Sequence, residues 1–235
     1  MIKQKGFGLP EVMISLLLAG LVNIALLNHF ITIKQQYSHL QSTMDDAMEL
    51  QLAADLIRDS IRQAGFTPCL SLNQLITVDQ RDAHEGLSSI QTGHELIIQR
   101  MGSEFNVMLG RLDSTRIVLT NDTIVRTDRP IILADCFHAE VQRVLDVHRS
   151  AEGQIVTLAN PLAFTYQQPV YAGEWLRERF FIRALSGLFY QRHHTDELSP
   201  LVKSLSVEEK EHLTVVRLGL DVDQSLTIEA RVRAW

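Results

Sequence analysis

The histidines and serines that could support catalysis do not occur at catalytic spacings. His193 and His194 are adjacent, but no third ligand stands at the spacing that a tetrahedral zinc site needs. His94 and Glu95 are not followed by the second histidine of a zinc-protease helix, and Ser186 lacks the flanking residues of a nucleophile elbow. The sequence also has no glycine-rich phosphate loop with its lysine. We therefore predict that the protein is not an enzyme and uses no metal and no cofactor.

Glu11 is an acidic residue whose position demands a partner. It stands at the start of an apolar run, and residues 12–33 contain no Asp, Glu, Lys or Arg. A carboxylate at that depth in a membrane is costly unless another group pairs with it. Lys3 and Lys5 precede the run, in the arrangement that holds a leader on the cytoplasmic side. The chemistry that this pattern indicates for Glu11 is charge pairing.

The apolar run itself is long enough to cross a membrane, because about 20 helical residues span the hydrocarbon core. A cleaved secretory signal would have a shorter apolar region that ends at a small-x-small site, and no convincing site of that kind follows Leu27. A plain signal anchor explains the length and the upstream lysines equally well. It does not explain Glu11.

Residues 5–14, Lys-Gly-Phe-Gly-Leu-Pro-Glu-Val-Met-Ile, resemble the class III signal of type IV prepilins. The shared features are a short basic leader that ends in glycine, an aromatic residue next, and a glutamate at the fifth mature position. The resemblance implies cleavage by the prepilin peptidase between Gly6 and Phe7, followed by N-methylation of Phe7. It also implies that Glu11 pairs with the α-amino group of Phe7 in a neighbouring subunit, which makes Glu11 an assembly residue.

Two positions depart from the usual prepilin pattern. Gly8 replaces the commoner Ser or Thr, and Pro10 stands where an aliphatic residue is more usual. Proline is tolerated in the first turn of a helix because its missing N–H would have had no acceptor within the helix. Neither departure damages the resemblance.

Three later segments resemble PilW-type minor pilins and follow in that family's order. They are residues 54–69, 135–141 and 183–192, which would correspond to a helix end with a following cysteine, a strand and a hairpin. The arginine-rich ending of the family is only echoed by residues 229–233. The resemblance implies a subunit that acts in priming or initiating pilus assembly with other minor pilins.

A long helix is expected to follow the leader, from about Leu9 to Ala64. Past the apolar run, apolar residues recur at steps of four and three on one helical face: Leu40, Met44, Ala47, Leu50, Ala54, Ile57, Ile61 and Ala64. Gly65 ends the pattern, and Pro68 prevents its resumption. Packing against a downstream sheet is the favoured use of this stripe, with a coiled-coil dimer as the alternative.

The remainder of the chain is predicted to form strands. Short β-rich runs separated by polar turns predict an α+β fold, with the long N-terminal helix packed on an antiparallel β-sheet domain as in the pilin fold that the resemblance implies. The runs are 95–98, 106–109, 116–119, 140–145, 155–158, a hairpin of 180–183 with 188–190, and a pair of 213–220 with 226–233. The charged run 208–211 is read as a solvated loop or a helix face.

Cys69 and Cys136 are the only cysteines, and they lack the close spacing of a zinc site or a redox dithiol. In an exported domain they could pair in a disulfide. Closing a loop of that size would stabilise the fold by roughly 4 kcal/mol on the chain-entropy model. Two unrelated buried thiols are the alternative if the domain stays in a reducing cytosol. Export favours the disulfide.

The overall composition indicates a packed domain and disfavours nucleic-acid binding. The chain has 235 residues, 46% of them hydrophobic and 21% charged, which indicates a packed domain, and its formal net charge is −6. No stretch concentrates Lys and Arg as a phosphate-binding surface requires. We therefore expect no direct binding to nucleic acid.

These patterns predict four regions. They are a leader at residues 1–6, a transmembrane and filament-core helix at 7–33, its amphipathic continuation at 34–64, and a β-rich periplasmic domain at 65–235. The resemblance implies a minor pilin of a type IV pilus, held by a single pass in the inner membrane or present in the assembled pilus. Its expected partners are other minor and major pilins, the prepilin peptidase and the inner membrane.

Two other functions stay open at this point. One is the J-like minor pseudopilin of a type II secretion system, whose leader and fold are similar. The other is a membrane-anchored periplasmic enzyme or binding module that uses the first helix only as a tether.

Overall fold

The computed structural model describes residues 8–233 except 82–85, 185, 211–212 and 221–223. Gly6 and Phe7, where cleavage and N-methylation are predicted, therefore lie outside the described residues. The chain divides into two compact units, residues 1–49 and residues 50–235. This boundary falls inside the region predicted as the amphipathic part of the helix.

The first unit is formed by most of one helix, α1 (Leu9–Arg62), whose last turns belong to the second unit. The helix begins where predicted and ends two residues before Ala64. Gly65 has a φ of +69°, in the left-handed region where glycine commonly follows a helix. A Cβ at Gly65 would lie 2.7 Å from the Cβ of Ser89, so the position also requires a residue without a side chain.

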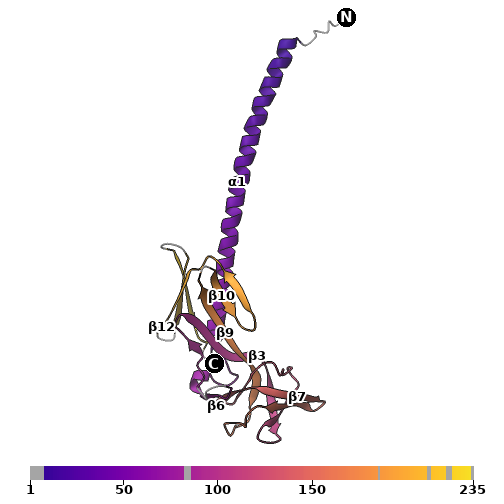
Figure 1. Cartoon of the computed structure of the whole chain (residues 1–235), viewed down its shortest axis with the longest axis vertical. Helices are drawn as coiled ribbons and strands as arrows, with labels where there is room; N and C mark the ends of the chain where they lie inside the picture. Colours follow the sequence, from indigo (N-terminus) through magenta and orange to yellow (C-terminus); the bar gives the residue numbers. More distant parts are fainter. Residues whose placement is uncertain (1–7, 82–85, 185, 211–212, 221–223, 234–235) are drawn as a thin grey trace. The chain divides into compact units, whose positions relative to one another are not determined.

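The second unit contains one short 3₁₀ helix, η1 (Leu72–Gln74), and strands that form two sheets within the described residues (Figure 1). The strands are β1 (Ile76–Asp79), β2 (Ile90–Gln91), β3 (Glu95–Arg111), β4 (Arg116–Leu119), β5 (Ile131–Ala134), β6 (His138–Gln142), β7 (Val144–Ser150), β8 (Gly153–Leu158), β9 (Tyr171–Arg183), β10 (Gly187–Gln191), β11 (Thr195–Ser199), β12 (Ser204–Lys210), β13 (Leu213–Gly219) and β14 (Ser225–Arg231).

The larger sheet has the order β1-β6-β5-β9-β3-β4-β8-β7, with β10 beside β9, β11 beside β10, and β2 beside β3. The smaller sheet has the order β12-β13-β14. The α+β class is confirmed. The larger sheet is nevertheless mixed, because β1 pairs with β6 in parallel, and the prediction of a purely antiparallel sheet was wrong on that point.

Several predicted strands and pairings are confirmed. The hairpin of β9 with β10 pairs Arg183 with Gly187, and the pair of β13 with β14 places Leu218 opposite Leu226. The charged residues 208–210 were placed in a loop or helix, but they belong to β12, which pairs with β13.

Two strand boundaries were predicted incorrectly. The runs 95–98 and 106–109 belong to one strand, β3, because the backbone bulges between Met101 and Phe105 while β9 continues to pair on both sides. The run 140–145 is divided instead. Its first part, in β6, pairs with β1 and β5, whereas β7 pairs with β8.

The main core of the second unit lies between the end of α1 and both sheets. Ala54, Ile57 and Ile61 of α1 pack with Phe180 of β9 and Val216 of β13, and all five are buried. Burying a side chain of isoleucine size contributes roughly 1.5–3 kcal/mol, so the last turns of α1 are an integral part of this domain.

The predicted apolar stripe of α1 is therefore buried only in its second half. Leu40 and Met44 are 65% and 69% exposed, and Ala47 is exposed as well. These residues belong to the first unit, which contains no strand within its described part. Packing of the stripe on a sheet is confirmed from Leu50 onward and wrong for the residues before it.

Candidate functional site

The start of α1 holds the carboxylate of Glu11 in a local capping arrangement. The backbone N–H of Gly8 donates to Glu11 Oε2 at 2.6 Å, and the N–H of Glu11 donates to the carbonyl oxygen of Gly8 at 3.1 Å. This is the geometry in which an acidic residue in the first turn closes back on the residue before the helix. The carboxylate also lies at the positive end of the helix dipole, where an acidic side chain stabilises the first turn.

The first unit presents a long apolar surface over residues 12–33. Every residue from Leu9 to Met48 is exposed, including Leu16, Leu21 and Phe30. An apolar surface of this length is not stable in water and indicates contact with a membrane or with another protein. α1 is long and apolar enough to cross a membrane, and this is the one such helix among the described residues.

In the second unit, a disulfide joins Cys69 and Cys136, whose Cα atoms are 5.2 Å apart. Cys69 follows the end of α1, and Cys136 lies in the turn between β5 and β6. The bond therefore connects the segment after α1 to the inner strands β5 and β6 of the larger sheet. Residues of these strands pack with the buried residues Leu72 and Trp175.

The turn that carries Cys136 is organised by the buried carboxylate of Asp135. Its Oδ1 accepts from the backbone N–H groups of Phe137 and His138 at 2.8 and 2.6 Å, and its Oδ2 accepts from the N–H of Gln167 at 2.8 Å. Burial alone would raise the pKa of Asp135, but these three donors outweigh it and hold the pKa below its ordinary value. Asp135 therefore stabilises the turn as a carboxylate.

A second buried carboxylate, Glu140 on β6, faces the loop between β8 and β9. Its Oε2 accepts from the N–H of Ala163 at 2.7 Å and from Gln80 Nε2 at 3.1 Å. Burial is the largest influence and raises the pKa of Glu140 above its ordinary value despite these donors. Burial and the nearby carboxylates also raise the pKa of Tyr166. Sequence reasoning missed this cluster because Glu140 looked like an ordinary strand residue.

The raised pKa predicts a particular pH dependence of stability. The folded chain holds a proton on Glu140 that the unfolded chain releases above its ordinary pKa of 4.5. The stabilisation from protonated Glu140 is complete below that value and is lost as the pH rises through the raised pKa. Relative to Glu140→Gln, the free energy of unfolding of the wild type should therefore fall by about 1.4 kcal/mol for each pH unit between the ordinary pKa of Glu140 and its raised pKa.

Urea denaturation of both proteins, at intervals from about pH 4 to about pH 8, measures this difference. Glu152→Gln, a matched change at an exposed turn, should leave the pH profile of the wild type unaltered. A difference between wild type and Glu140→Gln that stays constant over the whole range contradicts the prediction.

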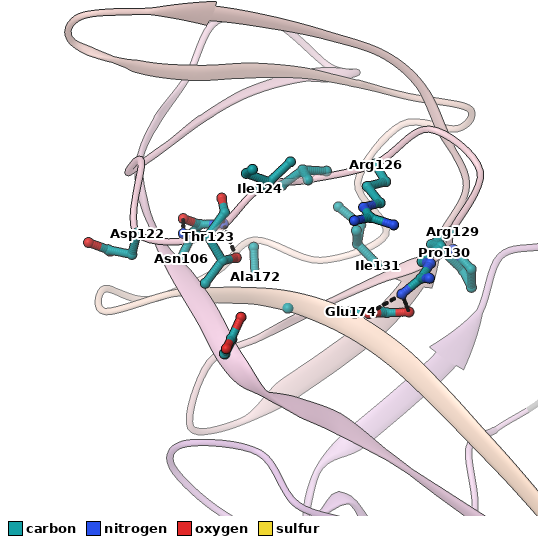
Figure 2. A pocket seen from close by; sticks show the side chains of 13 residues that line it. Asn106, Asp122, Thr123, Ile124, Arg126, Arg129, Pro130, Ile131, Ala172 and Glu174 are labelled. Atoms are coloured by element: carbon teal, nitrogen blue, oxygen red, sulfur yellow. Dashed lines mark hydrogen bonds and ion pairs between the residues drawn. The ribbon is translucent and has the colours of Figure 1, made fainter. Parts of the chain in front are cut away.

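The second unit also has a cavity of about 430 Å³ between the loop 122–130 and the strands β3 and β9 (Figure 2). Its wall combines apolar and charged side chains: Glu104, Asn106, Asp122, Thr123, Ile124, Val125, Arg126, Arg129, Pro130, Ile131, Ala172, Gly173 and Glu174. A volume of this size is within the range of small-molecule sites. These lining residues include no cysteine, histidine, lysine or serine.

Glu174 holds the rim of this cavity through an ion pair with Arg129 and a contact with His193. Arg129 Nη1 lies 2.9 Å from Glu174 Oε1, and His193 Nε2 lies 3.2 Å from the same oxygen. Burial and then the charge of Arg129 lower the pKa of His193, although Glu174 acts in the opposite direction. His193 is an exposed residue between β10 and β11, and Glu174 is its partner.

The predicted site residues are not brought together into one site. Glu11 belongs to the first unit, while the two cysteines belong to the second. Among the described residues, no three His, Cys, Asp or Glu side chains lie close enough together to hold a metal ion. No family model, no curated protein and no solved structure matches this chain.

Proposed function

We propose that the protein is a minor pilin that primes or takes part in type IV pilus assembly after leader cleavage and N-methylation. The observation that carries the proposal is the combination of Glu11 at the start of α1 with the exposed apolar surface that follows it. A tether alone requires an apolar span, but it gives no reason for a carboxylate at its beginning. An assembly helix does, because the carboxylate can pair with an amine of an adjacent subunit.

The domain with the disulfide fits an oxidising compartment such as the periplasm, which supports export of residues 50–235. The upstream lysines support the same orientation, with the leader in the cytoplasm. The pilin fold is part of this proposal, and its support is a long N-terminal helix whose last turns pack on a β-rich domain.

Mass spectrometry of the mature N-terminus tests the proposal directly. The expected first residue is Phe7, carrying one added methyl group on its α-amino nitrogen. A mature protein that still begins at Met1, or that is cut well beyond Phe7, contradicts it. Cells that lack the prepilin peptidase provide the control, since they should retain the intact leader.

A J-like minor pseudopilin of a type II secretion system is the alternative within the same class of machinery. The leader and the long helix support both roles equally. Deletion of the gene separates them, because loss of surface pili supports the pilus role and loss of exoprotein release supports the secretion role.

The cavity beside β3 and β9 favours a second class, a membrane-anchored binding module. In that case α1 is only a tether, and replacing Glu11 should have no effect, whereas a residue of the cavity wall such as Arg126 should be essential. The assembly role predicts the reverse.

A further inference from the structure

Strand β9 carries a row of arginines on the face that points away from the main core. Arg177, Arg179, Phe181 and Arg183 alternate along the strand and share one face, whereas Glu178 and Phe180 between them are buried on the other face. We call these four residues, together with Phe189 of the neighbouring strand β10, the arginine strip.

The phenylalanines of the arginine strip hold two of its three guanidinium groups, those of Arg179 and Arg183, in place. The guanidinium of Arg183 lies 4.5 Å from the ring centre of Phe189, and that of Arg179 lies 4.7 Å from the ring centre of Phe181. The two rings stack with their centres 6.0 Å apart. Arginines that already lie on aromatic rings lose little conformational entropy when they bind a partner.

Two of the three arginines retain their side-chain donors for a partner. Arg179 pairs with Glu95 of β3, but the side chains of Arg177 and Arg183 make no hydrogen bond or ion pair with any described residue. Both are exposed. Glu197 of β11 stands opposite Phe189, so the strip has three arginines against two carboxylates, on a chain whose formal net charge is −6. A surface of this kind suits a ligand with several carboxylates.

The chain itself contains an acidic segment of matching chemistry. Asp45 and Asp46 of α1 are exposed, and neither makes an ion pair with another described residue. Glu49 lies one turn further along, so the three carboxylates share one side of the helix. We call residues 45–49 the acidic segment.

We propose that the arginine strip binds the acidic segment of a second copy of this chain. Because the contact joins two different surfaces, a pair of copies keeps one strip free on one copy and one acidic segment free on the other, and further copies can add in the same sense. This inference rests on the proposed assembly function, since such a contact is useful between subunits that stand side by side. It adds a docking contact of the globular domain to the pairing of Glu11.

A charge exchange on the full chain, reconstituted in detergent micelles, tests the contact. The variant Arg177→Glu/Arg183→Glu and the variant Asp45→Lys/Asp46→Lys should each associate with themselves roughly tenfold more weakly than the wild type, because like charges replace opposite ones. A mixture of the two variants should regain the lost affinity. The association of the wild type should also weaken as salt is added.

The control is Arg111→Glu/Arg149→Glu, which makes the same change in net charge at two exposed arginines outside the strip. It should associate as the wild type does. Equal loss in this control, or no recovery in the mixture of reversed variants, overturns the proposal. The proposal is also overturned if the arginine strip binds a single-stranded oligonucleotide while the charge reversals leave self-association unchanged. That result would mean that the strip binds nucleic acid.

The outcome can be separated from the test of the proposed function. Glu11→Ala is expected to keep the charge-dependent association of the globular domains, because Glu11 belongs to neither surface. If both charge reversals leave self-association unchanged while assembly still requires Glu11, the docking contact is refuted and the proposed function is not.

Discussion

Replacing Glu11 with alanine is expected to exclude the protein from filaments while leaving leader cleavage and membrane insertion intact. The predicted cleavage site precedes Glu11, and the apolar span follows it, so we expect neither process to need the carboxylate. Removing one partner of a buried ion pair typically costs about 3–5 kcal/mol. At about 1.4 kcal/mol per factor of ten, incorporation should fall roughly hundredfold or more.

The structure adds a second role for Glu11 that must be separated from the first. Its side chain accepts a hydrogen bond from the N–H of Gly8, so alanine also removes a helix cap, which typically contributes about 1 kcal/mol. Glu11→Gln retains an oxygen for this bond but carries no charge. If pairing with an amine is the function, Glu11→Gln should fail to assemble almost as completely as Glu11→Ala.

Quantitative detection of the protein in sheared filaments and in membranes measures this effect. Glu152→Gln removes a charge from an exposed turn of the globular domain and should assemble normally. Normal incorporation of Glu11→Ala refutes the assembly role. Normal incorporation of Glu11→Gln together with loss of Glu11→Ala assigns the effect to the helix cap.

The sequence predicted the elements whose determinants are local. The helix α1 follows from a long stretch that has no proline after Pro10 in its first turn and only one glycine. Its end follows from Gly65, whose positive φ is a local backbone feature that glycine adopts readily. The hairpin of β9 with β10 was also predictable, because Ser186 and Gly187 between two β-rich runs are typical turn residues. In the structure, Gly187 has a positive φ of 122°.

Features that depend on distant partners could not be predicted. β3 looked like two strands because Gly102 and Ser103 resemble turn residues, and only the continuous pairing with β9 shows that they form a bulge. The parallel pairing of β1 with β6 has no local signal either. The same limit applies to the site residues. The pKa of Glu140 is raised by burial, and the loop that faces its carboxylate comes more than twenty residues later in the chain.

The exposure of Leu40 and Met44 illustrates a different limit. The heptad-like spacing correctly identified one helical face, but it could not say which part of that face the same chain would cover. Residues from Leu50 onward pack in the domain core, while the earlier ones are left for a membrane or a neighbouring subunit. A periodic pattern thus indicates burial without identifying the partner.

Removing the disulfide should produce the largest loss of stability in the globular domain. The bond closes a loop with a sequence separation of 67 residues. On the chain-entropy model, such a loop restricts the unfolded chain and contributes roughly 4 kcal/mol. Cys69→Ser/Cys136→Ser should therefore lower the free energy of unfolding by about this amount, whereas Asp135 should still hold the turn around position 136.

Urea denaturation followed by the fluorescence of Trp175 measures this change, because Trp175 is 3% exposed and packs in the core cluster beside the disulfide. Replacing Trp235 with Phe in every protein leaves Trp175 as the single reporter. The wild type treated with a thiol reductant should unfold at the same urea concentration as the double variant, which itself should not respond to the reductant. If reduction leaves the unfolding of the wild type unchanged, the disulfide does not stabilise the fold. The two cysteines would then give the domain no advantage in stability, and the argument for an oxidising compartment would lose its main structural support.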